Sequence, residues 1–187
     1  MTVIVLLVAT VAFRLLGLAG VRRFGTWRVS AAHGLAVMLV MTASAHFVPG
    51  DVTFMPNYDD MVAMVPSFVP FPGLMVYLSG VLELAGAVGL VLEPTRKAAG
   101  ICLALLFVAL LPANVNAAQL GLEDVGSPLW QRVPEQVLYI AVALWGAGLF
   151  TRFGAGRVSA GRVSEQRVSS SASRSSASER RDLPERV

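Results

Sequence analysis

Five long apolar runs dominate the sequence and restrict the folds that the chain can adopt. They span residues 3–19, 31–48, 74–92, 98–118 and 134–151. Each is close to the roughly 18 or more residues that an α-helix needs to cross about 30 Å of hydrocarbon. The chain is 55% hydrophobic and 14% charged, with a mean hydropathy of +0.66, which is unusual for a soluble domain. We therefore expect an all-α integral membrane helix bundle.

The first run, residues 3–19, is expected to remain as a transmembrane helix. A secretory signal peptide carries positive charge in front of its apolar segment. Here the leading side chains are uncharged and the basic residues come afterwards. Arg14 lies inside the run, and its long side chain is expected to extend to the nearer membrane interface.

Basic residues are distributed unevenly among the connections between the runs. The connections at 20–30 and 93–97, the tail after residue 151, and Arg14 together hold fourteen of the 15 basic residues. The connection at 49–73 has none and carries three aspartates. Because basic residues collect on the cytoplasmic side, we expect the N-terminus outside and the C-terminus inside a plasma membrane of the bacterial type. The net charge of +3 then marks orientation and not a nucleic-acid-binding surface.

The domain organisation follows from these runs and from one change of composition. Residues 1–30 are expected to form an N-terminal transmembrane helix with a basic cytoplasmic loop, and residues 31–153 a membrane core of four helices. After Phe153 the sequence becomes rich in Ser, Arg, Gly and Glu. Such a segment buries too little apolar surface to fold, so residues 154–187 are expected to be a disordered cytoplasmic tail.

The outer connection at 49–73 is predicted to contain one short helix. Its five prolines exclude a long helix, whereas Asn57 is a suitable N-cap with Asp59 and Asp60 in the first turn. Apolar residues then follow at 61, 64, 65 and 68, which is the spacing of one helical stripe. This helix is expected either to lie on the outer membrane face or to cover the end of the bundle as a lid.

Glu83 is the most unusual residue of the apolar runs. It lies about 13 Å from the outer end of its run, close to the middle of the bilayer. A carboxylate at that depth costs roughly 2.5–3.5 kcal/mol on insertion scales and therefore faces the bundle interior. Its helix neighbours Ser79, Gly80, Gly86 and Ala87 are small and share its face, so another helix can approach closely.

Further polar residues are predicted to surround Glu83 in an outward-opening pocket. We expect Glu83 and His46 to be candidates for proton transfer, and Tyr77, Ser79, Asn114 and Asn116 to be candidates for ligand binding. The alternative for each residue is that it forms hydrogen bonds between helices without a catalytic role. His33, near the inner end of its helix, is expected to be structural or to lie at the membrane interface.

The cysteine and histidine content limits the possible chemistry. Cys102 is the one cysteine, so an intrachain disulfide or a two-cysteine redox relay is excluded. We expect Cys102 to be a small buried apolar side chain. The two histidines lie at opposite depths, and no metal site is expected.

The sequence also resembles the DoxX family of small multi-pass membrane proteins. The motifs that carry this resemblance are "HF" (46–47), "MVPSFVPFP" (64–72), "VYLSGVLELAGAVGL" (76–90), "TRKAAG" (95–100) and "LLPANVNAA" (110–118). The resemblance implies a four-helix DoxX-like core with one added N-terminal helix. Members of that family have been linked to quinone-dependent oxidoreductases and to complexes with other redox proteins.

Two hypotheses about function follow. In the first, the protein is a quinone-associated or accessory subunit of a membrane oxidoreductase complex, in which Glu83 exchanges protons with a quinone and a partner subunit supplies electrons. In the second, the protein is a non-catalytic membrane module that binds a lipid-like ligand or stabilises partner proteins. The sequence contains no flavin or thiol motif that would make it a redox enzyme by itself.

Overall fold

Helices account for all the regular secondary structure in the residues that the structure describes. The computed structural model describes residues 1–52, 55–122 and 128–151. Their α-helices are α1 (Thr2–Leu18), α2 (Trp27–Ser44), α3 (Tyr58–Met64), α4 (Pro72–Val91), α5 (Arg96–Gln119) and α6 (Leu129–Gly146). Short 3₁₀ turns occur at η1 (Arg22–Phe24), η2 (Ala45–Phe47) and η3 (Leu149–Thr151). The expected all-α fold is confirmed for this part of the chain.

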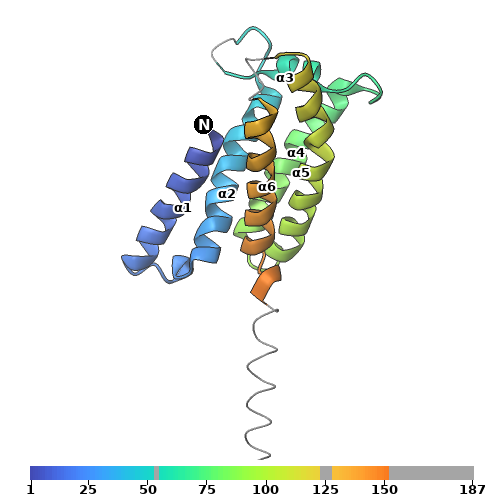
Figure 1. The fold of residues 1–187 in the computed structure, drawn as a ribbon. Coiled ribbons are helices and arrows are strands. Elements are labelled where there is room, and N and C mark those ends of the chain that lie inside the picture. The colour runs from blue at the N-terminus through green and yellow to red at the C-terminus, as the bar shows by residue number, and fades with distance from the viewer. Residues whose placement is uncertain (53–54, 123–127, 152–187) are drawn as a thin grey trace, which may run out of the picture. The chain divides into compact units, whose positions relative to one another are not determined.

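The four helices α2, α4, α5 and α6 form a bundle, with α1 against the outer side of α2 (Figure 1). α2 is the central helix, because it contacts α1, α4 and α6. Around each bundle interface the side chains are small. A Cβ atom on Gly100 of α5 would lie 2.6 Å from the carbonyl oxygen of Ala143 on α6. Such close approach is how helices associate in lipid, where the hydrophobic effect does not drive them together.

Three described helices are long and apolar enough to cross a membrane, namely Trp27–Phe47, α4 and α5. α1 is apolar but has 17 residues. The helices also expose large apolar side chains on their outer faces, such as Leu7 on α1, Val88 on α4, Leu105 on α5 and Val137 on α6. Contiguous exposed apolar surface of this kind indicates a membrane protein. That α1 and α6 also cross the bilayer remains a prediction.

The outer connection contains the predicted short helix. α3 begins after Asn57, whose side chain accepts a hydrogen bond from the Asp60 backbone while Asp60 accepts one from the Asn57 backbone. α3 packs on α4, α5 and η2, so it covers one end of the bundle (Figure 1). The expected apolar stripe is only partly correct. The helix ends at Met64, because Pro66 favours an extended conformation at Val65, and Phe68 is 77% exposed.

Pro112 lies inside α5, which continues to Gln119 in agreement with the run at 98–118. Two other details differ from the sequence-based expectations. α6 begins at Leu129 rather than at Pro134, which lies inside the helix. Cys102 is exposed and not buried, because a side chain in an apolar helix can face lipid as readily as the bundle interior. The predicted tail, residues 154–187, lies outside the described residues.

Candidate functional site

Glu83 faces the interior of the bundle, as its helix neighbours predicted. Its side chain is 5% exposed, and Ser79, Gly80, Gly86 and Ala87 on the same face of α4 are buried as well. The small residues permit close packing on both sides of the acid. Gly86 packs against Leu103 of α5, and Gly80 packs against His46 of η2. The carboxyl group is therefore enclosed by helices and separated from lipid.

Thr42 of α2 is the described hydrogen-bonding partner of Glu83. Its hydroxyl donates to Oε2 of Glu83 at 3.1 Å, and it also lies 3.2 Å from the carbonyl oxygen of Leu39. One hydroxyl has one proton to donate, so the two acceptors share it when Glu83 is ionised. A protonated Glu83 can instead donate to Thr42, which leaves the threonine proton for Leu39. The arrangement can therefore accept either protonation state of the acid.

His46 lies one helical turn from this pair. Its ring packs on Gly80, and a Cβ atom at that position would be 2.7 Å from Cβ of His46. Gly80 and Glu83 are three residues apart on α4, and Thr42 and His46 are four apart along α2 and η2. Along the antiparallel helices α2 and α4, Thr42 therefore lies opposite Glu83, and His46 lies opposite Gly80. An acid and an imidazole occupy successive turns of the same helix pair.

His46 is buried, at 8% exposed, and its Nδ1 atom makes no hydrogen bond with any described residue. The backbone carbonyls of Thr42 and Ala43 are close enough to the ring to act as weak hydrogen-bond acceptors. An imidazole carries both a donor and an acceptor. His46 thus retains hydrogen-bonding capacity at a position next to the buried acid.

The remaining candidate residues have other partners. Tyr77 is 45% exposed and stacks on Tyr58 with ring centroids 4.6 Å apart. Ser79 is buried but donates to the carbonyl of Val76 in its own helix, at 2.9 Å. Asn114 accepts a hydrogen bond of 2.7 Å from Arg132 of α6. The predicted pocket residues therefore do not converge on Glu83.

Asn116 connects α5 to the end of α3. Its Nδ2 atom donates to the carbonyl oxygen of Met64 at 3.0 Å, and the Met64 side chain is buried. The hydrogen bond fixes the last turn of α3 over the end of the bundle. Asn116 therefore positions the predicted lid, and does not face Glu83.

A groove lies along the outer half of α5, beside the segment that follows α3. It has a volume of about 400 Å³. We call it the α5 groove and define it by its lining residues, Pro66, Phe68, Val108, Leu111, Pro112, Val115, Asn116 and Gln119. Its walls are apolar, with the two amide side chains near one end. Of the predicted site residues, only Asn116 lines it.

His33 is buried at the opposite end of α2 from His46 and packs among aromatic rings, and its structural role remains a prediction. Its Nδ1 atom lies 2.8 Å from the carbonyl oxygen of Val29. The ring packs against Phe13 of α1 and Phe24 of η1, with centroids 5.4 Å and 5.0 Å away. Thirteen residues separate His33 from His46, which is about 20 Å along a helix. The two histidines therefore belong to different ends of the bundle.

Sequence reasoning missed Thr42, although a signal was present. Thr42 precedes His46 by four residues, so the two share a helix face. A hydroxyl on the same face as a buried histidine in an apolar run indicates a polar interface. The spacing does not show which helix lies opposite Thr42 and His46.

The fold and the buried acid define a class of helical membrane protein with a carboxyl group inside the bundle. Within that class, the chain belongs to the family described as domain of unknown function (DUF8561), which it matches over residues 35–147. The resemblance to the DoxX family is therefore wrong, because the matching family is DUF8561 and no match to DoxX is found. Searches of curated proteins and of solved structures find no match to the chain.

The interaction between Thr42 and Glu83 can be tested by stability measurements. We expect Thr42→Val to lower the free energy of unfolding by about 1 kcal/mol, because it leaves the buried carboxyl without this partner. Ser44→Ala is the matched control, since Ser44 also donates to a carbonyl three residues earlier but is exposed. Unfolding in mixed micelles measures both. Equal losses in the two variants would exclude a special role for the pair.

Proposed function

We propose that the protein is a five-span membrane protein of a bacterial-type plasma membrane, with its N-terminus outside and its C-terminal tail cytoplasmic. The positions of the basic connections support this orientation. Arg23, from the connection after α1, donates a hydrogen bond of 2.7 Å to the carbonyl of Val91 at the end of α4. The basic connections at 20–30 and 93–97 are therefore at the same end of the bundle, which we assign to the cytoplasm.

Labelling of single cysteines in intact cells tests this orientation. In a Cys102→Ala background, Asp51→Cys is expected to react with a membrane-impermeant maleimide, whereas Lys97→Cys is expected to react only after the cells are opened. Both positions are exposed, at opposite ends of the bundle. The reverse labelling pattern would refute the orientation.

The function that the geometry supports best is the binding of a lipid-like molecule in the α5 groove. The observation that carries this proposal is the lining of the groove, an open surface groove of about 400 Å³ that is apolar except for the amide side chains of Asn116 and Gln119. Its apolar walls lie on the outer half of a helix that is apolar enough to cross a membrane. A hydrocarbon or isoprenoid chain entering from the bilayer suits such walls better than a polar solute does.

The amide groups at the end of the α5 groove favour a ligand with a polar head. Gln119 is exposed there. Asn116 donates a hydrogen bond to the carbonyl oxygen of Met64, and its own side-chain carbonyl oxygen can still accept one. A quinone, a polar isoprenoid or a phospholipid would meet this requirement. The protein would then act as a non-catalytic membrane module that holds the ligand or presents it to a partner protein.

Filling the α5 groove tests this function. We expect Leu111→Trp to reduce the lipid-like molecule that co-purifies with the protein roughly fivefold or more, because the larger ring occupies the groove. Leu105→Trp is the matched control, since Leu105 is an exposed leucine of α5 outside the groove lining. Mass spectrometry of extracted lipophilic molecules measures the ratio to protein. Equal recovery from all three proteins would refute binding in the groove.

A second candidate function rests on the buried acid. A quinone takes up two electrons and two protons when it becomes a quinol. Glu83 and Thr42 provide a group that can gain or lose a proton, and His46 is adjacent through Gly80. In this proposal the protein is an accessory subunit, and an oxidoreductase partner supplies the electrons. The quinone head would have to reach the interface of α2 and α4, which the α5 groove does not line.

Glu83→Gln separates the two functions. The amide can still accept a hydrogen bond from Thr42 but cannot carry a proton at neutral pH. If Glu83 transfers protons, quinone reduction by membranes containing the protein is expected to fall about 100-fold or more. Glu93→Gln is the control, because Glu93 is an exposed acid just beyond the C-terminal end of α4. An unchanged rate in the Glu83 variant would exclude the proton-transfer role and leave ligand binding intact.

A further inference from the structure

The cytoplasmic end of the bundle concentrates positive charge from two distant parts of the sequence. We call this surface the basic end and define it by Arg22, Arg23, Arg28, Arg96 and Lys97. Two of these residues are engaged by the α4 C-terminus. Arg96 donates to the carbonyls of Leu90 and Val91 at 2.8 Å and 3.1 Å, and Arg23 donates to Val91 at 2.7 Å. These bonds cap the helix and draw the two connections together.

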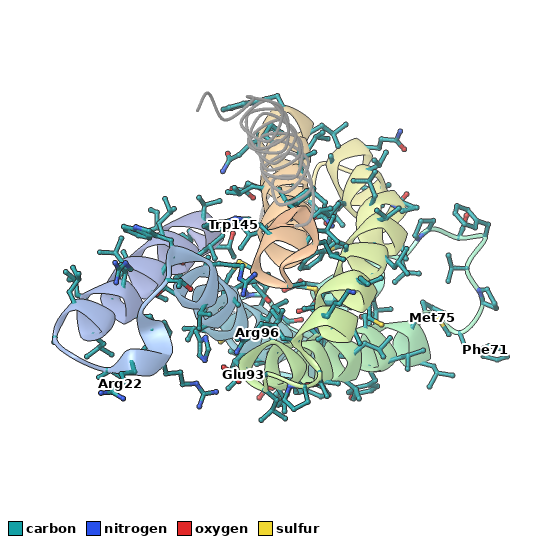
Figure 2. All side chains as sticks on the ribbon, turned by 90° about the horizontal axis from the view of Figure 1, so that it is seen from below. Arg22, Phe71, Met75, Glu93, Arg96 and Trp145 are labelled. Carbon is teal, nitrogen blue, oxygen red and sulfur yellow. The ribbon has the colours of Figure 1, made fainter. Side chains whose placement is uncertain are left out.

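The other three cations of the basic end have no such role. Arg22 and Lys97 are exposed and Arg28 is partly exposed, and none of the three side chains makes a hydrogen bond or ion pair with another described residue. Figure 2, which shows the bundle from this end, places Arg96 toward the middle of the helices and Arg22 at the edge. Arg96 is thus buried and bound to carbonyls, whereas Arg22 lies at the edge of the same end.

Little negative charge compensates this cluster. Glu93 is the one acid among the described residues of these two connections, and it attracts Arg96, while Arg23 and Arg28 are close enough to repel Arg96. Helices α2 and α5 also begin at this end, after Thr26 and Thr95. The partial positive charge of these two N-termini is offset by the C-termini of α1, α4 and α6 at the same end, so the excess charge comes from the side chains. Among the described residues of these two connections, five cations therefore face one carboxylate.

A tryptophan marks the level of the membrane surface beside the cluster. Trp27, the first residue of α2, is 54% exposed, and the guanidinium of Arg14 lies 5.6 Å from its ring centroid. Tryptophan and arginine are typical of the boundary between hydrocarbon and head groups. The basic end is thus at the depth of lipid phosphates.

We propose that the basic end binds the head group of an anionic phospholipid between the connections at 20–30 and 93–97. Arg22, Arg28 and Lys97 contact the phosphate, while Arg23 and Arg96 hold the two connections in place. Phosphate accepts charge-assisted hydrogen bonds from all three side chains. This site is separate from the α5 groove and from Glu83, and only the assignment of its leaflet depends on the proposed orientation.

Native mass spectrometry of the full-length protein in a neutral detergent tests the site. The probes are phosphatidylglycerol and phosphatidylcholine, which share acyl chains and differ in net charge. We expect phosphatidylglycerol to bind at least about tenfold more tightly, since each basic residue near an anionic surface contributes roughly a fivefold factor. The variant Arg22→Gln, Arg28→Gln, Lys97→Gln is expected to lose that preference.

The matched control removes the same charge from the tail, with Arg157→Gln, Arg162→Gln and Arg167→Gln. This variant is expected to keep the preference for phosphatidylglycerol within about threefold. Equal losses in the two triple variants would show that net charge and not a site is responsible, which would overturn the proposal. Equal binding of the two lipids by the unaltered protein would also overturn it.

Glu93→Gln is expected to increase the affinity for phosphatidylglycerol, and a misfolded protein would not show such an increase. The substitution removes the acid beside the cations, so the affinity for phosphatidylglycerol is expected to rise about fivefold, while that for phosphatidylcholine stays unchanged. A loss of affinity for phosphatidylglycerol, or an equal rise for both lipids, would contradict a site in which these cations contact the phosphate.

Discussion

The hydrogen bond between Thr42 and Glu83 fixes the pairing of α2 with α4, and much of the bundle depends on that pairing. In hydrocarbon a misplaced carboxyl has no water to replace its partner, so sliding one helix past the other is costly. The contact of His46 with Gly80 repeats the same pairing one turn further out. At the opposite end of α4, Arg96 and Arg23 hold the last carbonyls. α4 is therefore fixed by polar contacts at its middle and at its C-terminal end.

The two ends of the bundle have different chemistry, which follows from how each connection is built. The outer end is closed by a short capped helix, whose last carbonyl is held by Asn116. The segment after α3 turns away from the bundle through a series of prolines, and Phe71 adopts the left-handed conformation with φ of 52° just before α4. Phe71 lies at the outer edge of this loop (Figure 2). The loop forms one wall of the α5 groove, whereas the opposite end of the bundle presents the cations of the basic end.

Much of the fold could be predicted because the bilayer sets the length of each helix. The runs at 74–92 and 98–118 agree with α4 and α5 to within two residues at each end. The N-cap at Asn57 could be predicted from the residues that follow it in the sequence. The inward face of Glu83 followed from its small neighbours. These properties depend on residues that are close in sequence, so no knowledge of the helix arrangement was needed.

The candidate site was less predictable, because sequence gives the depth of a residue in the membrane but not the helix that it faces. Tyr77, Asn114 and Asn116 lie in the outer halves of their helices, as expected, yet the aromatic ring stacks on Tyr58, and the amides bond to Arg132 and Met64. Cys102 illustrates the same difficulty. Lipid and the bundle interior are both apolar, so an apolar run does not distinguish them.

The position of α1 has a consequence for the family to which the chain belongs. The matched region begins at Leu35, inside α2, and so does not include α1. Leu6 of α1 is nevertheless part of the core cluster with Leu35, and the hydroxyl of Thr2 lies 2.7 Å from that of Tyr139 on α6. A relative that lacked this helix would present a phenol group and a row of leucines to the bilayer. The flank of α2 and α6 is therefore a docking position for one more apolar helix, which this chain supplies as α1.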